Sequence, residues 1–295
     1  MAQFTAVPQC RHHGLIHSFS IVMTLNPLLR PFRKALVPVA FFSVVIPFSL
    51  GAQDAAHGAK DLAAQLSAKI VDGASFVKLR MEIRQPASGS KTSMNLYLKA
   101  RRTPSATDIL YQVIFPKERK GEAVLVQKKS GRSSGSILVP PAPPRPLSAA
   151  EMKEGLFGSD ISFEDLVENF FGWENQTLVG AETIGRTACQ ILESKPSKGD
   201  GSSYAKVRSW IDIKKMVPMR VEKYLASGQV AKRIETTDVK EDDLNRPVAR
   251  TLVVQRLGQD SITEVEGTES KHDVMYTDAD FTPEGLQKLS PPKSK

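Results

Sequence analysis

The sequence predicts a mainly β protein built around one large, curved antiparallel sheet. Many short segments alternate apolar and polar residues with the period of a strand. The turns between these segments are too short to hold crossover helices, so neighbouring strands must run antiparallel. About a dozen such segments occur, and a sheet of that size has to curl, close or split.

The first folded element is an amphipathic helix predicted over residues 54–71, with Leu62 and Leu66 on its apolar face. The next two segments form a hairpin around the turn QPASGSK, and they show the clearest alternation in the chain. Their inward residues are predicted to line the concave side of the sheet. These residues are Leu79, Met81, Ile83, Met94, Leu96 and Leu98.

Residues 148–173 interrupt the strands and are predicted to form a helical, lid-like insert. The proline-rich stretch 140–146 before it is predicted to stay outside the sheet, because proline lacks the backbone donor. Ser162 and the acids that follow it resemble a capping box that starts a helix over residues 163–171.

The insert also has an apolar side that must lie against something. Phe163, Leu166 and Phe170 would form the apolar face of the predicted helix, and Gly158 would allow a tight turn before it. The aromatic residues of the insert are predicted to face the sheet or its cavity. Ordinary core packing is an equally good interpretation of them.

Residues 1–52 are predicted to be a leader, followed by a single domain over 53–295. Translation is predicted to start at Met23, because basic residues and then an apolar run over 35–50 follow it, as in a secretory signal cleaved near Ala52. The alternative is an uncleaved anchor. The run contains two prolines and is shorter than the roughly 20 residues that a membrane span needs.

The net charge argues against a nucleic-acid-binding protein, and the few cysteine and histidine residues argue against a catalytic or metal site. The leader carries four basic residues and no acidic ones, so its removal lowers the net charge from +8 to +4. Cys189 is then the single cysteine and is predicted to be a small apolar residue in a strand. His57 and His272 lack metal-site spacing and are predicted to lie at the surface, and no cofactor or metal is expected.

Acidic residues in the insert allow one enzymatic alternative. Asp160, Glu164 and Asp165 could be read as paired carboxylates for glycoside hydrolysis. Capping of a helix start is the simpler explanation, because carboxylates stabilise helix N-termini. We therefore expect that the protein is not an enzyme. The predicted helices are too few to cover the sheet, which leaves an apolar concave side suited to acyl chains.

Three stretches of the chain resemble the outer-membrane lipoprotein-sorting family, the relatives of the LolA periplasmic carrier. They are LFGSDISFEDL, LVGAETIGRTACQILES and YAKVRSWIDIKKMVPMRVEKYLASGQVAKRIE. The first is the most specific, although Ile161 stands where an aromatic residue is usual. Its motif positions are Gly158, Ser159, Asp160, Ser162, Glu164 and Asp165.

The resemblance implies an unclosed half-barrel of about eleven strands with helices that form a lid over an apolar cavity. It implies a periplasmic carrier of lipoprotein acyl chains or another lipid, with transient membrane contact. An inner-membrane transporter or an outer-membrane acceptor would be the partner. Phe163 and Phe170 join the hairpin residues as expected lipid contacts. In LolA carriers an arginine latches the lid, and no arginine of this sequence is matched to it.

A second function is compatible with the same fold. The protein could be an envelope sensor or regulatory protein whose groove engages a membrane protein partner. Recovery of bound lipid would favour the carrier, whereas a protein complex with an empty cavity would favour the regulator.

Overall fold

The computed structural model describes residues 51–71, 73–288 and 291, with side chains from Gly58 onward. These residues belong to one compact unit, residues 48–295. The predicted translation start and the apolar run of the signal lie outside the described residues. Within the described part, no helix is both long and apolar enough to cross a membrane.

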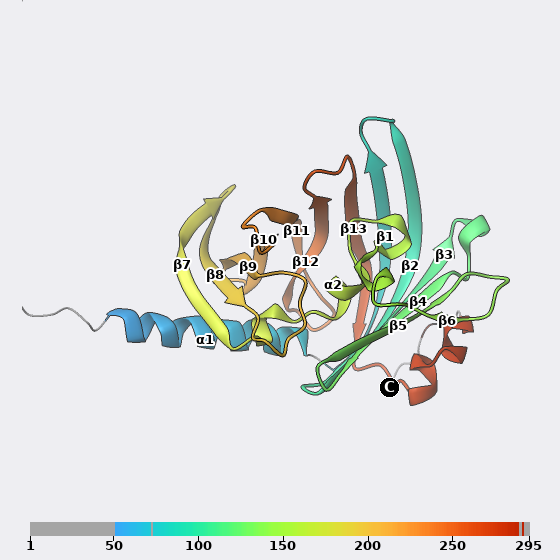
Figure 1. The fold of residues 1–295 in the computed structure, drawn as a ribbon, viewed down its shortest axis with the longest axis horizontal. Coiled ribbons are helices and arrows are strands. Elements are labelled where there is room, and N and C mark those ends of the chain that lie inside the picture. Colours follow the sequence, from blue (N-terminus) through green and yellow to red (C-terminus); the bar gives the residue numbers. More distant parts are fainter. Residues whose placement is uncertain (1–50, 72, 289–290, 292–295) are drawn as a thin grey trace, which may run out of the picture. The chain divides into compact units, whose positions relative to one another are not determined.

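Thirteen strands in the described residues form one antiparallel sheet that does not close (Figure 1). The mainly β, half-barrel fold is therefore confirmed, with thirteen strands where the resemblance implied about eleven. The strands follow one another in the sheet in the order β6-β5-β4-β3-β2-β1-β13-β12-β11-β10-β9-β8-β7. The pairing of β1 with β13 joins two meanders. The strands are β1 (Gly73–Gln85), β2 (Ser90–Arg102), β3 (Ala106–Phe115), β4 (Ala123–Lys129), β5 (Arg132–Leu138), β6 (Arg145–Pro146), β7 (Asn175–Ile184), β8 (Thr187–Lys195), β9 (Lys206–Asp212), β10 (Val217–Tyr224), β11 (Val230–Glu241), β12 (Pro247–Arg256) and β13 (Ile262–His272).

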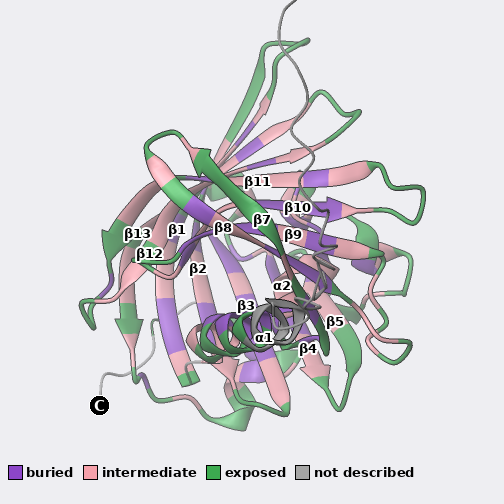
Figure 2. Ribbon diagram, turned by 90° about the vertical axis from the view of Figure 1, so that its left-hand side faces the viewer, coloured by how far each residue is buried: buried purple, intermediate pink, exposed green. Residues whose placement is uncertain are grey.

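The alternation predicted for the first hairpin is present in β1 and β2. Leu79 faces Leu96 across the pair, and Met81 faces Met94. Residues of this parity point to the concave side of the sheet, while their chain neighbours on the other side are charged or polar. In Figure 2 the buried positions accordingly alternate with more exposed ones along these strands.

Two α-helices lie within the curve of the sheet (Figure 2). They are α1 (Gly51–Ile70), close to the predicted range 54–71, and α2 (Phe163–Val167). Leu62 and Leu66 of α1 pack against Leu192 of β8 and Ile211 of β9. The concave side is therefore covered from within the curve, by α1 over β7–β9 and by the insert over β1–β4.

The convex side of β3–β5 is covered by the C-terminal segment. Two short 3₁₀ turns, Asp278–Phe281 and Glu284–Gln287, place Phe281 and Leu286 against Leu110 and Leu125. Cys189 of β8 is a buried free cysteine, as expected.

Two local predictions were wrong. The helix expected over 163–171 ends at Val167, because Glu168 adopts an extended backbone, and Phe170 belongs to a separate 3₁₀ turn, Phe170–Gly172. The proline-rich stretch does reach the sheet, since Arg145 and Pro146 form β6 beside β5. A proline is tolerated there because an edge strand leaves one side without ladder partners.

Candidate functional site

The insert between β6 and β7 packs on the concave side of β1–β4. Leu156 and Phe163 of the insert are buried and pack in one cluster with Met81, Met94 and Leu96 of the first hairpin. Ile83 belongs to the same cluster. Leu79 is a buried member as well and Leu98 packs at the edge, so all six predicted lining residues belong to this cluster and do not form an empty surface.

Backbone turns that only glycine accommodates shape the start of the insert. A Cβ atom on Gly155 would lie 1.9 Å from the carbonyl oxygen of Ser159, and Gly158 has a φ of +88°. The hydroxyl of Ser159 accepts the backbone N–H of Ile161 at 3.2 Å, so its hydrogen bond lies within the same turn. The family motif thus begins as a compact turn.

Asp160 anchors this turn to β13. The hydroxyls of Ser261 and Thr263 donate to its two carboxylate oxygens at 2.5 and 2.7 Å, and its backbone N–H donates to Thr263 Oγ1 at 2.9 Å. The carboxyl is fully buried, so these bonds replace the water that it loses. Asp160 is consequently a structural contact between the insert and the sheet.

Asp165 joins the insert to the other half of the sheet. It accepts the backbone N–H of Ser162 at 2.8 Å, which completes the expected capping box. It also forms ion pairs with Lys223 of β10, at 2.7 Å, and with Lys232 of β11. Lys223 reaches Glu168 as well, at 2.6 Å. We call these four charged residues, Asp165, Glu168, Lys223 and Lys232, the lid latch.

Burial and charge oppose each other within the lid latch. Burial alone would raise the pKa of Asp165, but the ammonium groups of Lys223 and Lys232 outweigh it and hold that pKa below its usual range. Burial would lower the pKa of Lys223, and the carboxylates of Asp165 and Glu168 reverse that and raise it. Burial lowers the pKa of Lys232, although the carboxylate of Asp165 opposes that shift. The insert is held by these buried ion pairs.

The remaining predicted residues fall in different places. Glu164 is half-buried, accepts the hydroxyl of Ser203 at 2.9 Å, and has a pKa raised by burial. Phe170 lies apart from the first hairpin and packs beside Phe171 and Trp173. The structure thus brings Phe163, but not Phe170, to the predicted lining residues.

A groove of about 650 Å³ remains on the concave side where β1 begins. Its floor is apolar and includes two of the predicted lining residues, Leu79 and Leu98. We call it the β1–β13 groove. The other apolar lining residues are Val77, Val248, Ala249, Leu252 and Val265, and charged residues such as Arg250 and Glu269 line the groove as well.

Missing side-chain volume explains why this groove is not filled. Gly267 of β13 faces Leu79 across the strand pair and contributes no side chain to the floor. The register of β13 also shifts there, because Thr268 is an extra residue between the partners of Lys78 and Leu79. Serine side chains at positions 75 and 270 add little volume at the same end. The hollow is therefore a feature of β13 that the alternation of β1 and β2 does not reveal.

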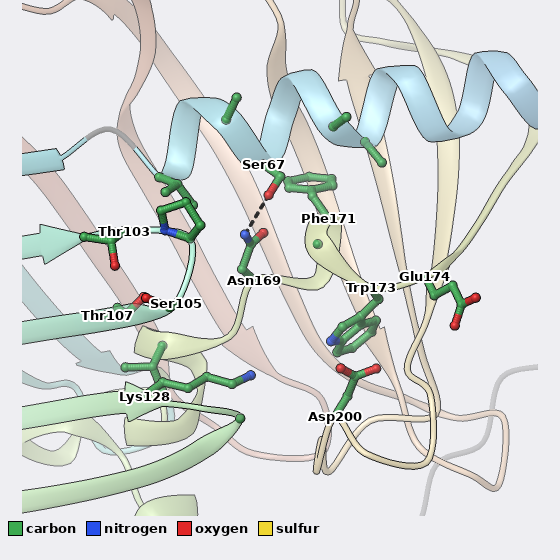
Figure 3. Close-up of a pocket in the computed structure, with 18 of the residues that line it drawn as sticks. Ser67, Thr103, Ser105, Thr107, Lys128, Asn169, Phe171, Trp173, Glu174 and Asp200 are labelled. Atoms are coloured by element: carbon green, nitrogen blue, oxygen red, sulfur yellow. Dashed lines mark hydrogen bonds between the residues drawn. The ribbon is translucent and has the colours of Figure 1, made fainter.

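A second cavity, of about 850 Å³, lies between α1 and the ends of β3 and β4 (Figure 3). We call it the α1 cavity. Phe171 and Trp173 form its aromatic wall, and hydroxyl groups of residues 103–107 and the amine of Lys128 face them. The amide of Asn169 donates to Ser67 Oγ at 2.8 Å and ties the insert to α1. This cavity is more polar in character than the β1–β13 groove.

One group of potential metal ligands lies at the rim of the β1–β13 groove. Ligand atoms of Asp242, Asp243 and His272 lie within 4.8 Å of one another. Arg246 already neutralises Asp242 at 2.8 Å, and His272 contacts Asp243. We assign these residues to the rim and not to a metal site. His272, expected at the surface, ends β13 with a side chain only 9% exposed.

Solved structures share this fold at low sequence identity. A DUF1329 family protein from Desulfovibrio piger is 20% identical with a TM-score of 0.72, and the match covers 79% of this chain and 99% of that one. An outer membrane lipoprotein-sorting protein domain from Vibrio parahaemolyticus is 18% identical with a TM-score of 0.69, over 79% and 100%. A LolA superfamily protein from Nitrosomonas europaea is 17% identical with a TM-score of 0.58, over 78% and 97%.

A family comparison agrees with the fold. Residues 106–288, more than half of the chain, match a family model that is described as an uncharacterized protein. The chain belongs to the family that this model describes, and it shares the LolA-like fold of the solved structures. The curated proteins contain no significant match to this LolA-like chain.

Sequence reasoning missed the residues that hold the LolA-like lid. Lysines, not an arginine, form the lid latch here. Lys223 lies two residues after the buried Val221 in β10, so both side chains point to the inward face of that strand. A lysine at an inward position was the sequence signal for a buried ion pair. Its carboxylate partners lie more than fifty residues earlier in the chain, so their pairing could not be read from the sequence.

Proposed function

We propose that this protein is a periplasmic carrier that binds an acyl chain of a lipoprotein or another lipid in the β1–β13 groove. The observation that supports this most directly is the groove itself, with seven apolar lining residues and no side chain at Gly267. Withdrawing each CH₂ group from water contributes about 0.8 kcal/mol, so an apolar floor of this kind favours a hydrocarbon chain.

The proposal includes the domain layout and the location of the protein. Residues 1–52 would be the leader, with a signal that is cleaved on secretion, and residues 53–295 would be the carrier domain with its insert at about 148–173. An inner-membrane transporter would load the carrier or an outer-membrane acceptor would unload it, through transient contact with either membrane.

No bond chemistry is part of this proposal. The three candidate carboxylates all have structural partners: Asp160 binds β13, Glu164 accepts the hydroxyl of Ser203, and Asp165 pairs with Lys223 and Lys232. Hydrolysis that is abolished by Asp160→Ala in a folded protein would overturn this part.

Native mass spectrometry of protein purified from an envelope fraction tests the carrier directly. We expect a mass increment from bound lipid that extraction with organic solvent removes. A complex with a membrane protein and no bound lipid would instead support the regulatory function. As a second measurement, affinity for fatty acids of increasing length should rise by roughly fourfold per CH₂ until the groove is filled.

A further inference from the structure

The two edges of the unclosed sheet are protected to different degrees. One edge is β6, which has only two residues, Arg145 and Pro146, at the end of the proline-rich stretch. Short strands, prolines and charged side chains are the features that prevent an edge from pairing with another chain. The other edge is β7, which has ten residues, no proline and a single charged residue, Glu182. Of the two edges, β7 alone has the length and composition of a strand that accepts a partner.

The backbone of β7 is hydrogen-bonded on one side only. Its ladder with β8 runs from the pair of Asn175 and Lys195 to the pair of Ile184 and Thr187. Within the described part of the chain, the backbone of residues 177–183 makes no hydrogen bond outside this ladder. The helix α1 packs on the concave face of the strand, against Leu178. Most of β7 is coloured as exposed in Figure 2, and its outward N–H and C=O groups are available to another strand.

The middle of β7 carries an exposed apolar residue. The register with β8 shifts between Leu178 and Gly180, so Val179 has no partner in that strand. The side chain of Val179 is 42% exposed. Pairing with β8 continues on both sides of this bulge, so the strand stays regular at its two ends. A strand that added to this edge would cover Val179.

The charges at the two ends of β7 fit a second copy of the same strand. Glu174 precedes the strand and Arg186 follows it, and both side chains are exposed. Neither forms an ion pair or a hydrogen bond with another described residue. The extended chain between them spans roughly 35 Å, so they do not meet within one molecule. In an antiparallel pair of identical strands, Glu174 of each copy lies beside Arg186 of the other copy.

A two-fold axis through the middle of β7 accommodates the remaining side chains as well. Val179 then lies beside the same residue of the second copy, and the pair buries apolar surface near the axis. Glu182 lies opposite Thr177 of the second copy and not opposite another carboxylate. Its side chain also accepts Trp210 Nε1 at 2.6 Å, which holds it on its own sheet. No like charges meet along the paired strands.

We propose that β7 is a docking edge for a second copy of this chain, through antiparallel β7–β7 pairing about a two-fold axis. The pairing joins the two half-barrels into one continuous sheet. The inference is independent of the proposed carrier function, because β7 does not line the β1–β13 groove. Ten residues from each copy are fewer than the roughly 20–30 of a standard interface, so we expect a weak dimer with a Kd of roughly 1–100 μM.

Sedimentation velocity of the protein purified from an envelope fraction tests the inference. Over a concentration range of roughly 1–200 μM, we expect the monomer to convert to a dimer and to no larger species, because a two-fold contact closes on itself. Hydrogen exchange localises the contact. The amides of residues 177–183 should exchange about tenfold more slowly at the high concentration than at the low one.

Val179→Lys should raise the Kd of the dimer at least about tenfold, because it places two like charges near the axis. The variant should fold, since this side chain is exposed and has no partner in β8. The matched control is Val139→Lys, at a valine that is 49% exposed and lies outside β7. The control should form the dimer as the parent does.

Charge reversal at the ends of β7 tests the antiparallel register. Arg186→Glu and Glu174→Arg should each weaken the dimer, because each places like charges together at both ends of the pair. The double variant should restore most of the lost affinity, because the two reversed charges again attract each other between copies. A role of either residue in the stability of its own chain would not produce this rescue.

Three outcomes would overturn the inference. The first is a protein that stays monomeric over the whole range with unprotected β7 amides. The second is a dimer that Val179→Lys and both charge reversals leave unchanged, which would use another surface. The third is protection of β7 by a different, co-purified protein while the pure chain is monomeric, which would assign the edge to that partner. None of these outcomes affects the carrier function, which is decided by lipid binding.

Discussion

Gly267 is the position at which the acyl-binding proposal can be tested most sharply. A Cβ atom built on it would lie 3.7 Å from the carbonyl oxygen of Arg250 and 3.9 Å from Val77 Cγ1, which are ordinary contact distances. Its φ lies outside the left-handed region. Gly267→Leu should therefore be accepted by β13 and should extend four carbon atoms into the β1–β13 groove.

The expected loss of affinity follows from the volume that leucine occupies. If its side chain displaces about three CH₂ groups of the ligand, binding weakens by about 2.4 kcal/mol, which is roughly 50-fold in Kd. Stability should stay the same or rise by about 0.5–1 kcal/mol, because glycine is unfavourable inside a strand. Weaker binding would then not result from unfolding.

The assay is displacement of a fluorescent fatty acid, with thermal unfolding measured on the same samples. The matched control is Gly199→Leu, in the loop between β8 and β9, where an added Cβ atom meets nothing within 4 Å. The control should bind as the parent does. A folded Gly267→Leu protein with unchanged affinity would show that the chain binds elsewhere, and the groove would lose its proposed role.

Three further predictions concern the insert. Lys223→Met should lower the free energy of unfolding by about 3–5 kcal/mol, because it removes the ion pair of Glu168 and leaves Asp165 with Lys232 alone. Lys214→Met at an exposed turn should change it little, and urea unfolding distinguishes the two variants. Phe163→Ala should cost about 3–5 kcal/mol in the same assay, and a loss below about 1 kcal/mol would mean that the insert is not packed on the first hairpin. The folded-state pKa of Asp165 lies below its unfolded value of about 3.9, so its contribution to stability is complete above that value and is lost as the pH falls from roughly 5 toward 2. Urea midpoints measured across this range should fall less steeply in Asp165→Asn, and parallel curves would contradict the assignment.

Local sequence patterns determined the strands, their inward faces and much of the insert. The alternation of β1 and β2 has a period of two, which fixes both strand identity and the face of each residue. The capping box at Ser162 is equally local, since its groups lie within one turn of helix. These predictions needed no knowledge of distant residues.

Only the tertiary structure decided which part of the concave side is covered and which stays hollow. Met81 and Leu79 look alike in the sequence and share one buried cluster, yet only Leu79 also reaches the groove. That difference depends on where the lid latch holds the insert and on a glycine in β13, nearly two hundred residues away along the chain. Periodicity assigns a side chain to a face, but the volume left above that face is set by every other segment that packs on it.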